Sequence, residues 1–172
     1  SGEETNVEDT TVVSFEPEVH PQHVSAETKV SDSSGGVVEP IQPAEIVVIN
    51  VMARDGYTFS GDDLLQVLIN AGLKFGEMNI FHKRLGNDSK SLLVFSVANI
   101  LNPGTFDLNN LDSFSTLGIS LFLALPTAIN NMDAFEQMLA VAQQVGSTLD
   151  GELKDDHRNV MTAQTIQHYR QR

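Results

Sequence analysis

Few residues of this 172-residue chain combine the types and spacing that catalysis or metal binding requires. His20 and His23 lie three positions apart and could form a weak metal clip, but a metal site also needs an ordered second shell. Asp155-Asp156-His157 offers ligand atoms, yet acids just before a helix ordinarily complement its dipole, and Asp62-Asp63 admits the same interpretation. His82 lies at the expected end of a strand with no acid placed to orient it, so it is interpreted as a rim residue.

Other common forms of chemistry have no residues to support them. The chain has no cysteine, which excludes disulfides and thiol catalysis. Gly56, Gly61 and Gly72 do not have the spacing of a phosphate-binding loop. The acidic pairs give no sign of a catalytic dyad. The sequence therefore predicts a protein that is not an enzyme, with no catalytic residue, no metal and no cofactor.

The charge distribution divides the chain into two parts. Residues 1–44 carry nine acids against one base, Lys29, and contain four prolines and a Ser-Ser-Gly-Gly run at 33–36. Such a composition cannot bury enough apolar surface to fold, so we predict a disordered acidic linker over 1–44 and a domain over 45–172. The net charge of −13 argues against a nucleic-acid partner, because phosphate binding needs clustered Lys and Arg.

The beginning of the chain suggests a piece of a longer protein. It starts at Ser1-Gly2 without an initiator Met, so we expect an excised fragment. No apolar run approaches the roughly 20 residues of a membrane span. A membrane anchor could still lie in a part of the protein that precedes this chain.

The elements that position the remaining residues follow from hydrophobic periodicity and turn residues. Strands are predicted at 46–53, 76–83, 91–100 and 117–125, with a short one near 149–154. A first helix is expected after a cap at Ser60 or Asp62, with Leu64, Leu65, Val67, Leu68 and Ile69 as its buried stripe and Gly72 at its end. Further helices are predicted at about 131–146 and 162–171. This order indicates an α+β fold with a mostly antiparallel sheet.

The strands are apolar on both faces, which is the most informative feature of the sequence. Alternate residues of a strand point to opposite faces, and a sheet with one wet face should show polar residues there. One face carries the larger branched residues and suits a core under two or three helices. The other face carries smaller residues, with Met and Phe among them: Ile46, Val48, Met78, Ile80, Ala98, Ile100, Ser120 and Phe122. Met and Phe are frequent at binding surfaces.

Two interpretations of this second face stay open on pattern alone. Both faces could lie inside the same domain, or the surface could simply be apolar, as monomer surfaces partly are. Alternatively, a partner covers a contiguous apolar patch.

Several segments of the chain resemble one known family, in order, from about Glu45 to the C-terminus. They include Phe75-Gly76-Glu77-Met78-Asn79-Ile80-Phe81-His82, Asn102-Pro103-Gly104-Thr105-Phe106-Asp107, and Asp155-Asp156-His157-Arg158 through Met161-Thr162. These segments resemble the C-terminal domain of the ZipA family of bacterial cell-division proteins.

This resemblance implies a split β-α-β domain with a six-stranded antiparallel sheet and three helices on one face. It implies that the free face forms a shallow hydrophobic cleft for the C-terminal tail of FtsZ, the tubulin-like division protein. The implied contact positions are Ile46, Val48, Met78, Ile80, Ala98, Ile100, Ser120 and Phe122. It also implies a role in septation, at the cytoplasmic face of the inner membrane, through an upstream anchor that tethers the Z ring.

Two other classes of function compete with this expectation. A sheet with exposed aromatics can stack the bases of single-stranded nucleic acid, but such a platform needs a basic groove, and the second face has one aromatic, Phe122. A small-molecule enzyme would need convergent titratable groups in a pocket, and none is readable.

Overall fold

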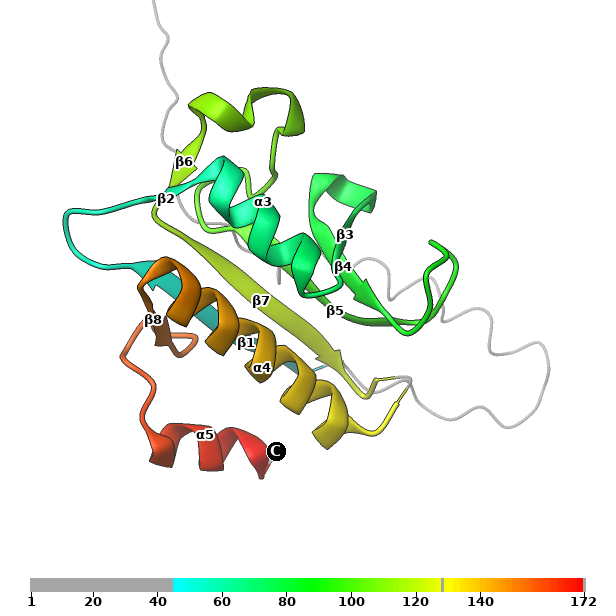
Figure 1. Cartoon of the computed structure of the whole chain (residues 1–172). Coiled ribbons are helices and arrows are strands. Elements are labelled where there is room, and N and C mark those ends of the chain that lie inside the picture. Colours follow the sequence, from blue (N-terminus) through cyan, green and yellow to red (C-terminus); the bar gives the residue numbers. More distant parts are fainter. Residues whose placement is uncertain (1–44, 128, 172) are drawn as a thin grey trace, which may run out of the picture. The chain divides into compact units, whose positions relative to one another are not determined.

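The computed structural model describes residues 45–127 and 129–171 (Figure 1). The linker predicted over 1–44, and with it the candidate clip of His20 and His23, lies outside the described residues. The described residues form an α+β fold with a mixed set of long and very short strands.

A six-stranded sheet organises the fold. Its strand order is β3-β4-β5-β7-β1-β8, and each of its pairings is antiparallel. The strands are β1 Glu45–Ala53, β3 Lys74–Phe75, β4 Phe81–Arg84, β5 Leu93–Asn99, β7 Gly118–Leu125 and β8 Gly151–Lys154. A separate two-stranded ribbon joins β2 Phe59–Ser60 to β6 Ser115–Thr116. Because β4, β5 and β7 lie between β3 and β1, the β1-α3-β3 unit is split, as the family resemblance implied.

Each helix begins at a side-chain cap that its sequence provides. Ser60 accepts a hydrogen bond from the Asp63 amide at the start of α3 (Gly61–Asn70). Asn130 does the same for Met132 and Asp133 before α4 (Asn131–Leu149). Thr162 forms a capping box with Thr165 before α5 (Ala163–Arg170). Short 3-10 turns complete the set, η2 at Glu77–Asn79 and η3 at Leu108–Ser113.

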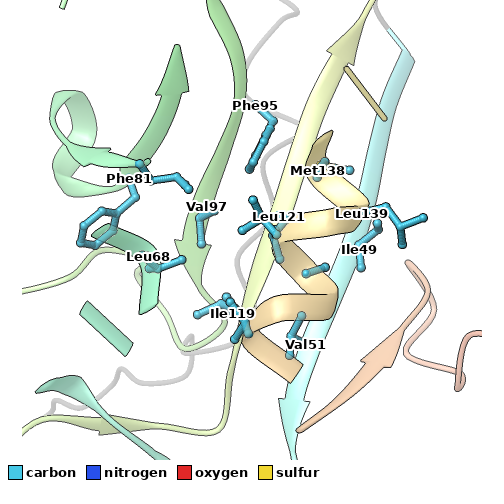
Figure 2. Packing of buried hydrophobic residues seen from close by; sticks show 14 of the residues in the cluster. Ile49, Val51, Leu68, Phe81, Phe95, Val97, Ile119, Leu121, Met138 and Leu139 are labelled. Carbon is cyan, nitrogen blue, oxygen red and sulfur yellow. The ribbon is translucent and has the colours of Figure 1, made fainter. Parts of the chain in front are cut away.

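The core fills the space between one face of the sheet and helices α3 and α4. Figure 1 shows both helices lying across the same face. Figure 2 shows Met138 and Leu139 of α4 near Ile49 and Leu121, with Phe81, Phe95 and Val97 further along the sheet. Residues at alternate positions of β1 and β7 are buried there: Val47, Ile49, Val51, Ile119, Leu121 and Leu123. Hydrophobic burial on this face is the main stabilising contribution to the fold.

Three sequence predictions need correction. The strand predicted over 76–83 begins only at Phe81, because Met78 and Asn79 have left-handed backbone angles, with φ of 62° and 59°. The second helix runs beyond 146 to Leu149, because Gly146 lets the helix approach β8 and stays helical. Ile69, placed in the buried stripe of α3, is exposed.

The third helix is fastened to the rest of the fold by one buried tyrosine and one ion pair. The Tyr169 ring packs against Phe135 of α4, with ring centroids 5.8 Å apart. Its hydroxyl donates to the Val48 carbonyl at 3.1 Å and accepts from the Asp156 amide at 3.2 Å. Arg170 makes a bidentate pair with Glu136 of α4. All three helices therefore pack on the same side of the sheet.

Tyr169→Phe is expected to lower the free energy of unfolding by about 1 to 2 kcal/mol, because it leaves the Val48 carbonyl and the Asp156 amide without this partner. The measurement is thermal unfolding followed by circular dichroism. Tyr57→Phe is the matched control, since the Tyr57 side chain is exposed. Equal melting temperatures for the two variants would contradict the role assigned to the Tyr169 hydroxyl.

Candidate peptide-binding face of the sheet

The second face is the side of the sheet opposite α3 and α4. Strand register places its residues in rows that cross several strands. One row contains His82 of β4, Ser96 of β5, Phe122 of β7 and Val48 of β1. The next row contains Ala98, Ser120, Asn50 and Lys154. Ile46 and Ala124 form a third pair. Four predicted contact residues, Val48, Ala98, Ser120 and Phe122, thus lie in two adjacent rows.

Two short segments bring the other predicted residues to the ends of the strands. Met78 and Ile80 belong to the η2 turn and the residue after it, before β4 begins. Ile100 follows β5 and continues its pairing, because its amide donates to the Gly118 carbonyl of β7 at 3.0 Å. The sequence pattern placed these residues on regular strands, whereas the structure places them on irregular backbone at the strand ends.

The eight predicted residues differ in how much solvent they meet. Met78 is 72% exposed and Ile46 is 41% exposed. Val48, Ser120 and Phe122 are half-buried. Ile80, Ala98 and Ile100 are buried, yet they lie outside the main core cluster. The predicted contact residues therefore range from exposed to buried.

Polar side chains lie in the middle of this face, and their contacts were not predicted from the sequence. Asn50 is buried and accepts a hydrogen bond from the Ser120 hydroxyl. Its amide nitrogen donates to the Asp155 carbonyl at 2.9 Å. Strand alternation alone could have placed Asn50 here, but its partner 105 residues away could not be read from the sequence. The Ser120 hydroxyl is thus occupied within the protein.

His82 is a second missed residue. It was expected at the rim, but it is only 5% exposed. Nδ1 lies 2.8 Å from the Ser96 hydroxyl, and Nε2 lies 2.9 Å from the Glu77 carbonyl. A carbonyl can only accept, so Nε2 carries the hydrogen and donates to Glu77. Both ring nitrogens are therefore engaged within the protein.

Charged groups near the described sheet are mostly engaged in structural contacts. Lys74 donates to the Asn87 carbonyl at 2.9 Å, and Lys154 lies 3.7 Å from Glu152. Hydrogen bonding and charge from Asp150, with Glu152 adding to them, raise the pKa of Arg54. The hydrogen bond to Glu136 likewise raises the pKa of Arg170. The Arg54 and Arg170 pairs each join two different parts of the fold.

The acidic motifs have structural roles too. Asp62 and Asp63 lie in the first turn of α3, as expected for dipole complements. The Asp155 carboxylate accepts from the amides of His157 and Asn159 at 2.9 and 2.8 Å, so it orders a loop and is not at the start of α5. Within residues 45–127 and 129–171, no three His, Asp or Glu side chains gather in a way that could hold a metal ion.

A cavity of about 320 Å³ lies on the helix-covered side of the sheet, away from the second face. It is lined by Val47, Leu123, Leu125, Asn130, Asn131, Met132, Phe135, Tyr169 and Arg170. It is therefore separate from the predicted contact residues. In the described part of the chain, no helix has the length and apolar character needed to cross a membrane.

Comparison with known proteins places these features in one family. The model of the family described as "ZipA, C-terminal FtsZ-binding domain" matches residues 45–172. The chain is 48% identical over 146 residues to the cell division protein ZipA of Ectopseudomonas mendocina, covering 85% of this chain and 53% of that protein. It is 52% identical over 128 residues to ZipA of Azotobacter vinelandii, covering 74% of this chain and 45% of that protein.

The match is to part of each relative. A third relative, ZipA of Pseudomonas paraeruginosa, is 47% identical over 139 residues, which are 81% of this chain and 48% of that protein. The chain spans about half the length of the curated relatives it matches. The family is one of cell-division proteins and not of enzymes. Its model covers the whole sheet and all three helices, so the chain belongs to the family of ZipA C-terminal FtsZ-binding domains.

Proposed function

We propose that this chain is a non-enzymatic peptide-binding module that receives the C-terminal tail of FtsZ on the second face of its sheet. The observation that carries the proposal is the cross-strand row of Val48, Phe122 and Ser96, next to the row of Ala98 and Ser120. This row lies opposite the helices, in a domain whose family is defined by FtsZ binding. The described helices α3 and α4 pack against the other face.

The contact set that we propose has anchors and supporting residues. Phe122 is the aromatic among the eight and lies in the central row, so it serves as the anchor. Met78 and Ile46 are exposed and can close on the peptide from the two sides. The buried residues Ile80, Ala98 and Ile100 shape the surface below a shallow apolar cleft.

We further propose that the longer protein carries a membrane anchor upstream of this fragment. Binding of FtsZ tails would then tether and stabilise the Z ring at the cytoplasmic face of the inner membrane during septation. The acidic segment 1–44 would act as a linker between anchor and domain and would not contribute to peptide binding.

Isothermal titration calorimetry with a synthetic peptide of the FtsZ C-terminal tail tests this function. The full chain and a chain of residues 45–172 should bind it with equal affinity, and a scrambled peptide should not bind. If neither chain gave a binding signal with the tail peptide, tail binding would be refuted. A tenfold loss in the shorter chain would instead assign a part of the site to residues 1–44.

The alternative of a nucleic-acid platform finds little support. Two basic residues on the second face already have partners within the protein. Lys74 donates to the Asn87 carbonyl, and Lys154 forms an ion pair with Glu152. Lys83 shares the face of Phe95, which is the core side. A titration with fluorescent single-stranded DNA at low salt is expected to show no tight binding.

Binding of the FtsZ tail is expected to depend weakly on salt, because the proposed contacts are apolar and Lys83 lies on the other side of the sheet. Between about 0.05 and 0.3 M salt we expect Kd to change by less than about threefold. Calorimetry at matched pH and temperature measures this change. A steep loss of affinity with salt would show that charged residues at the rim dominate the interaction.

A further inference from the structure

We propose that His82 is a positioning residue that holds the η2 turn, and with it Met78, in the shape required for peptide binding. The inference rests on the proposed function, because it concerns the same face. It assigns a role to a buried side chain that touches no peptide itself.

The turn that carries Met78 needs to be held. Met78 has φ 62° and ψ 14°, and Asn79 follows with φ 59°. Two successive non-glycine residues in the left-handed region cost conformational free energy, because the Cβ atom approaches the following carbonyl. Asn tolerates this conformation better than Met does. Without support from the surrounding structure, the segment is expected to relax toward extended backbone.

The bonds within the turn are local, and one of them is long. The Asn79 amide donates to the Gly76 carbonyl at 3.0 Å, and the Gly76 amide donates to the Ile80 carbonyl at 3.0 Å. The Ile80 amide donates to the Glu77 carbonyl at 3.4 Å. The Phe106 amide adds a bond to the Asn79 carbonyl at 3.0 Å. The Glu77 carbonyl therefore has a weak backbone partner and a stronger one in His82 Nε2 at 2.9 Å.

His82 is well placed to transmit the order of the sheet to this turn. It is 5% exposed and is itself fixed by Ser96, which is 4% exposed and lies on β5. Water is largely excluded from both side chains, so a lost bond would not be replaced easily. Ser96 pairs in register with Phe122. A series of contacts thus connects the proposed anchor to the turn that presents Met78. Phe122 of β7 pairs with Ser96 of β5, and His82 bonds to both Ser96 and the Glu77 carbonyl.

The consequence for binding follows from preorganisation. Met78 is 72% exposed, so little else restrains its side chain. If the turn opens, Met78 samples other positions, and the peptide has to order it again on binding. Removal of the His82 donor is therefore expected to weaken binding through Met78 and not through Phe122.

A double-mutant cycle in the full chain tests this coupling, with the FtsZ tail peptide as probe. His82→Leu removes the donor at similar volume and should weaken binding about fivefold. In the background of Met78→Ala the same change should cost less than about twofold, because its target is gone. In the background of Phe122→Ala it should still cost about fivefold. His82→Gln, whose amide can reach the Glu77 carbonyl, should recover most of the affinity.

Hydrogen exchange provides a readout without peptide. His82→Leu should speed exchange at the Asn79 and Ile80 amides, which lie in the turn, relative to amides of β7. Val97→Ala is the matched control, because Val97 is buried on the core side of β5. It should lower the melting temperature while leaving peptide affinity and exchange in the turn unchanged.

Three results would overturn the proposal. They are unchanged affinity in folded His82→Leu, an undiminished His82 effect in the Met78→Ala background, or unchanged exchange in the turn. A wild-type chain that bound no FtsZ tail would instead overturn the proposed function, and the binding role of His82 with it. The exchange experiment distinguishes the two failures, because it reports on the turn alone.

Discussion

Phe122→Ala is expected to weaken binding of the FtsZ tail by about 2 kcal/mol or more, which is roughly thirtyfold in Kd. Phe122 lies in the central row of the second face, between Val48 and Ser96, and is half-buried. A few aromatic residues usually carry most of the energy of an interface. Calorimetry on the full chain measures the loss, and circular dichroism establishes that the variant is folded.

A milder variant serves as the comparison for this result. Met78→Ala should weaken binding less than Phe122→Ala, because Met is flexible and its neighbours can repack. If Phe122→Ala bound the peptide as the wild type does, Phe122 would not be the anchor. If it unfolded the domain, Phe122 would belong to the core.

Leu121→Ala is expected to destabilise the domain by about 3 to 5 kcal/mol. Leu121 precedes Phe122 in β7 and points to the opposite face, where it is fully buried beneath the helices (Figure 2). Truncation removes apolar contacts and leaves a cavity between the sheet and α4. Urea unfolding followed by circular dichroism measures the change in the free energy of unfolding.

The adjacent positions form a matched pair. Under conditions in which Leu121→Ala remains folded, its affinity for the peptide should be close to that of the wild type. Its loss of melting temperature should exceed that of Phe122→Ala. Equal destabilisation by the two changes would mean that the two faces of β7 were assigned wrongly.

Much of the fold could be predicted from the sequence, because it depends on neighbouring residues. Alternation in β1 and β7 identified the core positions Ile49 and Leu121 and the opposite positions Val48 and Phe122. Ser60, one of the two caps expected for the first helix, is the observed cap of α3. The resemblance to the ZipA family, carried by whole segments of sequence, implied the six-stranded sheet that the structure has.

Other features depended on contacts between distant segments. The pattern of residues 77–81 looks like a strand, yet Met78 and Asn79 turn left-handed, and Phe106 and His82 bond to this turn. The two-stranded ribbon of β2 and β6 has two residues in each strand, which are too few to show the alternation of a strand.

The sequence by itself determined which strand residues lie on the same face of the sheet, where helices begin and to which family the chain belongs. The tertiary structure decided that His82 is buried, that Asn50 bonds to Ser120 and the Asp155 carbonyl, and that Tyr169 reaches Val48 across 121 positions. The physical reason is that periodicity and capping act between residues a few positions apart. A buried polar group is instead satisfied by whichever partner folding brings to it, and that partner can come from any part of the chain.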